Sequence, residues 1–177
     1  MKVTLDHNCI IDLLKGNVTG VKIKTLISSG TCDCYVVDIG ASEMHERGVR
    51  PDRYDLFDQL LSSAGIAHLP RLSPMFIPDV TFLDKSIAAC GEMIALANKI
   101  EDILFGNVPQ TAGVKWQNRL CDVHTMWCHI QNGNQVFLTS DKNFMKQTKF
   151  QRLLDLGAGR ICRPTGLNTS DKMIHFV

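Results

Sequence analysis

The sequence predicts an α/β fold in three layers, with helices on both faces of a central parallel sheet of four to five strands. Two observations lead to this prediction. Short apolar or β-branched runs alternate along the chain with longer segments of helical periodicity, which is typical of parallel sheets. The chain has 177 residues and an apolar content of 45%, enough for one compact core, and we expect residues 1–177 to form a single domain.

The N-terminal half begins with a strand and a helix in close succession. Residues 2–5, Lys-Val-Thr-Leu, have the composition of a short strand. Asn8 is placed to cap a helix over 9–15, which Gly16 ends. The further elements expected in this half are a helix at 18–29, a strand at 34–37, a helix from 38 or 40 to 47, a helix at 51–63 and a short strand at 66–69.

The C-terminal half contains the longest predicted helices. Residues 70–82 hold three of the six prolines, and no regular element fits them. Apolar spacing predicts helices over 84–104 and 114–131. The remaining elements expected are a strand at 135–139, a short helix near Asn143, a helix at 147–155 and a strand at 159–162. The region 68–112 then forms an extra helical segment beside the alternating strands and helices.

The seven cysteines are odd in number and scattered along the chain. This pattern differs from a disulfide framework, so we expect reduced, buried thiols and a cytoplasmic protein. We also expect no signal peptide and no membrane span. The formal net charge of +1 neither supports nor excludes nucleic-acid binding, so any phosphate-binding surface has to be local.

Four acidic residues are candidates for one shared site. Asp6 and Asp141 follow the first and fourth predicted strands, Glu43 lies in the helix after the second strand, and Asp122 interrupts an apolar helix face. Ligands of open parallel sheets bind beyond the carboxyl ends of the strands, and all four residues can reach that edge. Each residue alone has a structural alternative, as a helix cap or a solvated side chain.

Four carboxylates in one pocket require a counter-charge, because burial and mutual repulsion would otherwise raise their pKa values. A hard divalent cation supplies that charge, since Mg²⁺ takes oxygen ligands and engages phosphate. We therefore expect a Mg²⁺ or Mn²⁺ site for phosphodiester hydrolysis, in which the metal activates water. Its proposed ligands and catalytic residues are Asp6, Glu43, Asp122 and Asp141.

Four segments, in chain order, resemble motifs of the PIN-domain family of metal-dependent ribonucleases. LDHNCIIDLL is similar to the family's opening Leu-Asp-Thr-Asn and apolar helix, and IGASEMHERG to its Thr-x-x-Glu helix, with Glu43 at the acidic position. LCDVHTMWCHIQNG resembles the helix that carries the third acid, here Asp122. VFLTSDKNF resembles the Leu-Thr-x-Asp-x-Asp-Phe strand end, with Asp141 as the fourth acid. Residues 68–112 are the least typical part.

The resemblance implies cleavage of single-stranded RNA by metal-activated water, leaving 5′-phosphate ends. Many small members are VapC-type toxins, so an antitoxin protein and a second copy of the chain are expected partners. The chain departs from the pattern at His7, where Thr or Ser is usual, and at Asn143, where a further Asp is common. Supporting roles beside the acids are expected for Asn8, His7, Thr139, Ser140 and Asn143.

Basic residues flank the proposed site on both sides. Lys142, Lys146 and Lys149 follow the Asp141 strand end, and Arg47 follows the Glu43 helix. These residues are candidates for contacts with RNA phosphates that do not depend on sequence. The alternative is that they belong to two solvated faces.

Two other functions remain open. A phosphatase of the haloacid-dehalogenase kind would use Asp6 as its nucleophile, but it needs an Asp two positions later, where this chain has Asn8. A non-catalytic PIN-fold module that binds nucleic acid or protein is favoured by the departures at His7 and Asn143.

Overall fold

The computed structural model describes residues 1–40, 44, 53–106 and 114–167, and it confirms the predicted α/β fold. Five strands, all parallel, form one sheet in the order β3-β2-β1-β4-β5. The strands are β1 (Lys2–Leu5), β2 (Asp33–Val37), β3 (Arg71–Leu72), β4 (Val136–Leu138) and β5 (Arg160–Cys162). The central strand β1 is buried from Val3 onward, as expected for a sheet covered on both faces.

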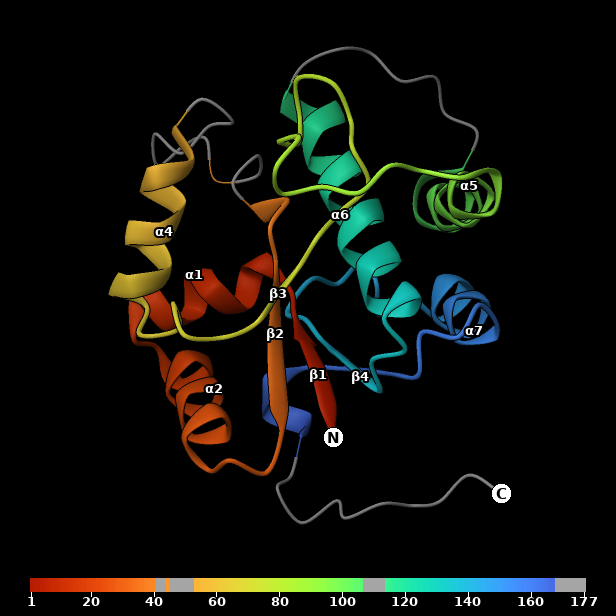
Figure 1. Ribbon diagram of the computed structural model, residues 1–177. Helices are drawn as coiled ribbons and strands as arrows, with labels where there is room; N and C mark the ends of the chain where they lie inside the picture. The colour runs from red at the N-terminus through yellow and green to blue at the C-terminus, as the bar shows by residue number, and fades with distance from the viewer. Residues whose placement is uncertain (41–43, 45–52, 107–113, 168–177) are drawn as a thin grey trace.

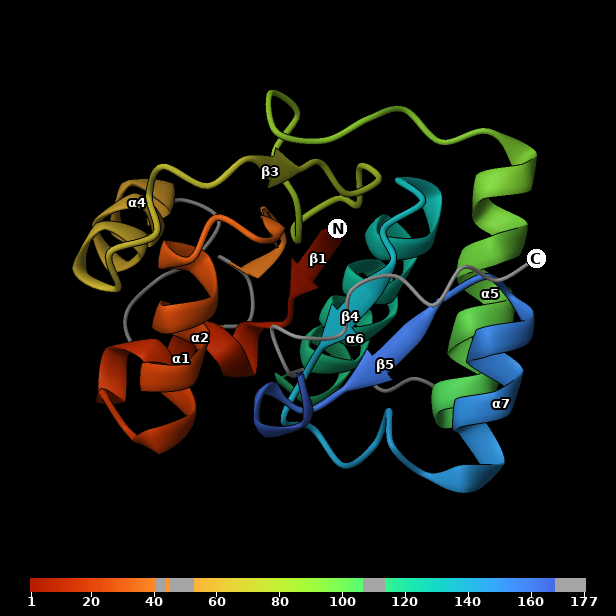
Figure 2. The ribbon, with the colours of Figure 1, turned by 90° about the horizontal axis from the view of Figure 1, so that it is seen from below.

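Helices cover the two faces of the sheet, as Figures 1 and 2 show from two directions. One face carries α1 (His7–Lys15), α2 (Val18–Ser28) and α4 (Tyr54–Ser63); the other carries α5 (Gly91–Phe105), α6 (Val114–Gln131) and α7 (Gln147–Asp155). Each face has its own apolar core. Because side chains alternate along a strand, Val36 packs into the first core and Val37 into the second. A short 3₁₀ helix, η3 (Pro164–Gly166), follows β5.

The winding direction of the chain reverses between β1 and β4. From β1 the chain moves outward through β2 to β3, then returns through α5 and α6 to β4, on the other side of β1. Leu5 of β1 pairs with Leu138 of β4, so the residues that follow these strands emerge side by side. Open α/β sheets bind ligands at such a reversal, and the topology therefore points to the ends of β1 and β4.

The entry into α1 differs from the sequence prediction. Asp6, and not Asn8, is the N-cap: its backbone is extended, and its Oδ1 accepts a hydrogen bond from the His7 N–H at 2.8 Å. Helix α1 therefore begins at His7. Gly16 ends the helix with φ 59°, a left-handed conformation that residues with a Cβ adopt at a cost.

Most other predicted elements are confirmed, and the largest errors lie between 66 and 90. Helices α6 and α7 have the predicted bounds. The strand expected at 66–69 is wrong, because these residues form turns. The third strand, β3 at Arg71–Leu72, lies instead within 70–82, where no regular element was expected. The short helix expected near Asn143 is a turn. The helix expected from 38 or 40 to 47, and the start of the one expected at 51–63, fall largely outside the described residues.

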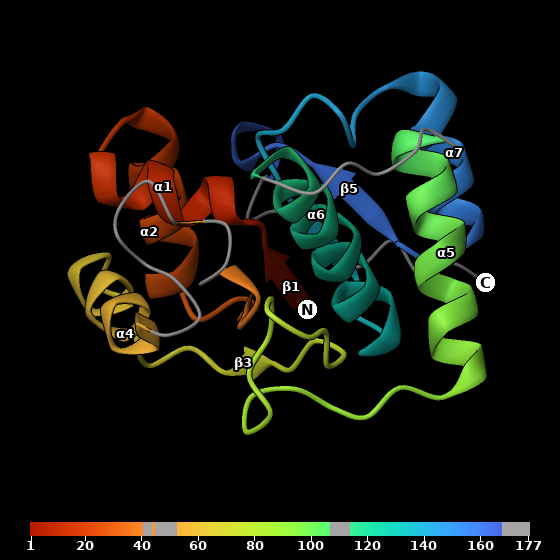
Figure 3. The ribbon, with the colours of Figure 1, turned by 90° about the horizontal axis from the view of Figure 1, so that it is seen from above.

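Residues 73–90 carry the chain from the β3 edge of the sheet to α5 on the other side of α6 (Figure 3). The helix expected at 84–104 begins only at Gly91. The reason is Ile87, which forms backbone hydrogen bonds within the segment 73–90. Its N–H donates to Pro74 O and its carbonyl accepts from the Phe76 N–H, both at 2.9 Å. Backbone pairing with the start of the same segment therefore competes with helix formation.

All seven cysteines, which were expected to be buried, lie within the described residues and carry free thiols. Five of them are buried, whereas Cys32 is half-buried and Cys90 is exposed. No helix in the described ranges is long and apolar enough to span a membrane.

Candidate metal centre at the ends of β1 and β4

Asp6 lies at the carboxyl end of β1 and is 1% exposed. Its N–H donates to Leu138 O at 3.0 Å, which extends the pairing of β1 with β4 by one residue. Its carboxylate accepts hydrogen bonds from, among others, the His7 N–H at 2.8 Å, the Thr139 hydroxyl at 2.6 Å and the Asn8 amide at 3.2 Å. Asp6 is therefore a buried carboxylate that its hydrogen bonds hold in one orientation.

Asp141 is connected to Asp6 through Thr139, the first residue after β4. The Thr139 hydroxyl donates to Asp6 Oδ2 and accepts the N–H of Asp141 at 2.9 Å. Asp141 Oδ1 in turn accepts the Asn143 N–H at 2.8 Å, which closes a tight turn. These contacts bring Asp6 and Asp141 to the same end of the sheet, where the winding of the chain reverses.

Asp122 approaches this corner from α6. It is half-buried, between the buried residues Cys121 and Val123. Its position shows in the pKa of Lys149: burial lowers that pKa most, Lys146 lowers it further, and the charges of Asp141 and Asp122 act to raise it. Asp122 and Asp141 therefore lie within electrostatic reach of one ammonium group.

Lys149 is a half-buried residue in the first turn of α7. Its ammonium donates to Leu104 O, near the end of α5, and to Asn143 Oδ1 at 2.6 Å. An ammonium has three N–H donors, and these contacts use two of them. Lys142 and Lys146 are exposed, so they are better placed than Lys149 to meet RNA phosphates.

His7 is a buried residue that directly follows Asp6 in the chain. It is 1% exposed, and its ring lies against Gly40, where a Cβ would come within 2.6 Å of ring atoms Cδ2 and Nε2. This close approach explains a glycine at position 40 and assigns His7 to the packing of the β1 and β2 ends. Asn8, by contrast, is half-buried and reaches Asp6 directly.

Cys9 is a buried neighbour of Asp6 that is unsuited to bind metal. Its Sγ donates to Leu138 O at 3.2 Å. Burial first, and then the charges of Asp6 and Asp12, raise the pKa of its thiol well above the usual value. Metal ligation and nucleophilic attack both require the thiolate, so we expect Cys9 to remain a protonated packing residue.

Asp12 is an acidic residue that the sequence analysis missed. Its Oδ2 accepts from the Ser140 hydroxyl at 3.1 Å, and its Oδ1 from the Asn17 amide at 2.8 Å. Ser140 therefore ties the end of β4 to α1. The signal in the sequence was Asp12 itself, the one charge inside the run Cys-Ile-Ile-Asp-Leu-Leu.

Glu43 and Arg47 lie outside the described residues. Among the residues that are described, no group of three or more His, Cys, Asp or Glu side chains forms a metal-binding cluster. The donors at the β1 and β4 ends are nevertheless of the type that a hard divalent ion prefers: carboxylates joined by one hydroxyl. In chemistry, the Asp6 and Asp141 carboxylates fit Mg²⁺ or Mn²⁺.

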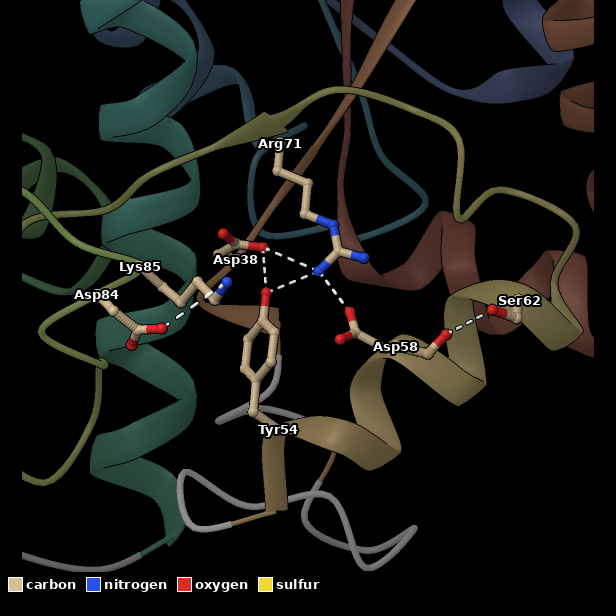
Figure 4. A network of polar contacts seen from close by, with 7 residues as sticks. All are labelled: Asp38, Tyr54, Asp58, Ser62, Arg71, Asp84 and Lys85. Carbon is tan, nitrogen blue, oxygen red and sulfur yellow. Dashed lines mark hydrogen bonds and ion pairs between the residues drawn. The ribbon is translucent and has the colours of Figure 1, made fainter.

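A second polar cluster, at the end of β2, was not predicted (Figure 4). Asp38 is 6% exposed and accepts a hydrogen bond of 2.5 Å from the Tyr54 hydroxyl. Arg71 Nη1 donates to that hydroxyl at 2.8 Å and lies 3.6 Å from Asp38 Oδ1 and 2.6 Å from Asp58 Oδ1. The cluster therefore joins β2, α4 and β3.

The pKa values in this second cluster reflect burial with partial compensation. Burial raises the pKa of Asp38, while the Tyr54 hydrogen bond and the Arg71 charge oppose the shift. The pKa of Tyr54 is also raised, by burial first and then by Asp38. Asp38 directly follows Val36 and Val37, so the rule that singled out Asp6, a carboxylate after a buried strand, would also have found it.

Comparison of the chain with family models, curated proteins and solved structures finds no match. The candidate site therefore rests on its own geometry and on the motif resemblance.

Proposed function

We propose that this protein is a metal-dependent endoribonuclease that cleaves single-stranded RNA. One observation carries the proposal: Asp6 and Asp141, which follow β1 and β4, are joined through the Thr139 hydroxyl where the sheet changes its winding direction. Ligand sites of open α/β sheets lie at this location. Asp122 and, by the motif resemblance, Glu43 complete the proposed acidic set.

In this proposal the chain holds the metal and orients its ligands. When bound, Mg²⁺ or Mn²⁺ activates a water and offsets charge on the phosphate under attack. Thr139 aligns the Asp6 carboxylate with the Asp141 turn, and Asn8 contributes a second side-chain donor to Asp6. The exposed Lys142 and Lys146 contact RNA phosphates beside the site, so RNA binding should weaken as salt concentration rises.

The phosphatase alternative fits the geometry less well. A nucleophilic aspartate has to reach the phosphorus atom with one oxygen. Both oxygens of Asp6 accept hydrogen bonds, and the residue is 1% exposed. The non-catalytic binding module remains the second candidate, favoured by Asn143 at a position where the resembled family often has an acid.

The motif resemblance also supports a protein partner. An antitoxin and a second copy of the chain both belong to this proposal, with the cytoplasm as the compartment that suits seven free thiols. A small reading frame that overlaps the upstream end of the gene would support the toxin role.

The test is cleavage of an unstructured RNA with Mg²⁺ or Mn²⁺. Asp141→Asn preserves an oxygen acceptor for the Asn143 N–H but removes the charge, so we expect cleavage to fall roughly a thousandfold. Asp155→Asn is the matched control, because Asp155 is an exposed acid of α7 outside the site; this variant should cleave like the wild type. A wild-type protein that cuts no RNA with either metal, or an Asp141→Asn variant of full activity, would contradict the proposal.

A further inference from the structure

Lys149 stands at one end of a continuous series of hydrogen bonds that reaches the buried carboxylate. Its ammonium is anchored on Leu104 O at the end of α5 and donates to Asn143 Oδ1 at 2.6 Å. The Asn143 N–H then donates to Asp141 Oδ1 at 2.8 Å. The Asp141 N–H donates to the Thr139 hydroxyl at 2.9 Å, and that hydroxyl donates to Asp6 Oδ2 at 2.6 Å.

Each link of this series is consistent in its donors and acceptors. An ammonium only donates, so it meets the Asn143 side-chain oxygen, and a hydroxyl can donate once while it accepts. The turn that carries Asp141 is consequently held from two sides: by Thr139 toward β1 and by Asn143 toward α7. Lys149 supplies the only one of these contacts that links the turn to helices α5 and α7 rather than to the strands.

We propose that Lys149 is a positioning residue of the metal site, which holds Asn143 and thereby fixes the turn that presents Asp141. The proposal rests on the proposed nuclease function and deepens it. In the resembled pattern an acid at the position of Asn143 is common; here an amide takes its place, and a lysine in the first turn of α7 holds that amide. The ammonium therefore acts on the metal through the turn and makes no contact with substrate.

The direction in which metal affinity changes when Lys149 is removed distinguishes a positioning role from a purely electrostatic one. Lys149 lies within electrostatic reach of Asp141 and Asp122. If it acted only through its charge, its removal would relieve repulsion of the incoming cation and tighten metal binding. If it positions the turn, its removal disorders a metal ligand and weakens binding, as is found when outer partners of metal ligands are lost.

The experiment is a calorimetric titration of the full chain with Mn²⁺. We expect Lys149→Met and Asn143→Ala each to weaken Mn²⁺ binding about tenfold. The double variant should bind about as weakly as either single variant, because both substitutions break the same connection. Lys149→Arg, which keeps a donor in place, should recover most of the affinity. Lys22→Met, at an exposed lysine of α2, is the control and should bind like the wild type.

The outcomes distinguish this inference from the proposed function. Unchanged or tighter Mn²⁺ binding by Lys149→Met, or additive losses in the double variant, would overturn the positioning role while wild-type binding still supports the nuclease. A wild type that binds no Mn²⁺ would overturn both. Circular dichroism of each variant verifies folding, and Asn143→Ala, at a half-buried turn position, tests the same connection should Lys149→Met fail to fold.

Discussion

Two strands of one sheet end in a buried aspartate, and the two aspartates have different surroundings. Asp38, after β2, contacts a tyrosine hydroxyl and lies 3.6 Å from the Arg71 guanidinium. Asp6, after β1, accepts hydrogen bonds from a backbone N–H, a threonine hydroxyl and an asparagine amide. The first arrangement neutralises a carboxylate with a cation of the protein, whereas the second orients a carboxylate with neutral groups.

The comparison shows that the role of a buried aspartate depends on its contacts as well as on its position in the sheet. Both residues occupy the edge where parallel sheets bind ligands, so position alone does not separate them. Arg71 also contacts Asp58 on α4, which makes the Asp38 cluster a connection between structural elements. The Asp6 cluster instead connects to a second acid, Asp141, through Thr139. This contrast is the reason why we propose a metal-binding role for the second cluster and a stabilising role for the first.

Two buried histidines of α6, His124 and His129, should give acid the largest effect on the free energy of unfolding. Burial lowers the pKa of His124 and of His129 from 6.5 to about 4, and the His129 bond to Ala158 O opposes the shift. Below pH 6.5 the unfolded chain then binds more protons than the folded one. The stabilisation is complete above pH 6.5, and we expect a loss of about 3 kcal/mol per histidine as the pH falls to 4.

Urea unfolding across that pH range measures this loss. His124→Leu removes one of the two buried imidazoles and should reduce the acid-dependent loss by about half. An unfolding free energy that stays constant between pH 6.5 and 4 would contradict the neutral, buried state of both rings. The comparison of the two aspartate clusters should therefore be made at neutral pH, where both histidines are uncharged.

Arg71→Met tests the Asp38 cluster. The substitution leaves a buried carboxylate without its cation, and we expect the free energy of unfolding to fall by about 3 kcal/mol, with little change in RNA cleavage. Arg152→Met is the control, because Arg152 pairs with Asp102 at 2.8 Å on the surface, where such pairs contribute about 0–1 kcal/mol. Equal losses of stability in the two variants would remove the distinction that we draw between the clusters.

The sequence predicted those helices and strand-end residues for which one physical signal, such as apolar spacing, is sufficient. The apolar period of 114–131 and 147–155 gave helix bounds that the structure reproduces. Asp6 and Asp141 could be placed at one edge because parallel strands end together. The prediction failed where contacts with residues outside the local segment determine the backbone conformation. Ile87 has the spacing of a helical residue, but its backbone pairs with Pro74 and Phe76.

Asp38 shows the same limit within the candidate sites. Its partners Tyr54 and Arg71 lie 16 and 33 positions along the chain, and Tyr54 reaches it from a different element. A sequence contains no local signal for such a contact. The acidic motif was visible because its members sit at strand ends and helix faces with characteristic spacing, whereas the cluster that neutralises Asp38 depends on how α4 and β3 pack.

Thr139→Val tests the Asp6 cluster with a smaller expected change in stability. Valine preserves the shape but removes the hydroxyl that joins Asp6 Oδ2 to the Asp141 N–H. We expect the free energy of unfolding to fall by about 1–2 kcal/mol and RNA cleavage to fall strongly, because both carboxylates lose their common contact. Thr139→Ser retains the hydroxyl and should keep most of the activity. Activity in Thr139→Val equal to that of the wild type would show that the connection does not serve catalysis.

The most direct test is the location of a bound ion. A crystal of the protein soaked in Mn²⁺ and measured at a wavelength where manganese scatters anomalously would show where the metal lies. The account predicts one strong peak within ligand distance of both the Asp6 and Asp141 carboxylates, about 2.0–2.2 Å from their oxygens. A peak at the Asp38 cluster, or no peak at the ends of β1 and β4, would contradict it.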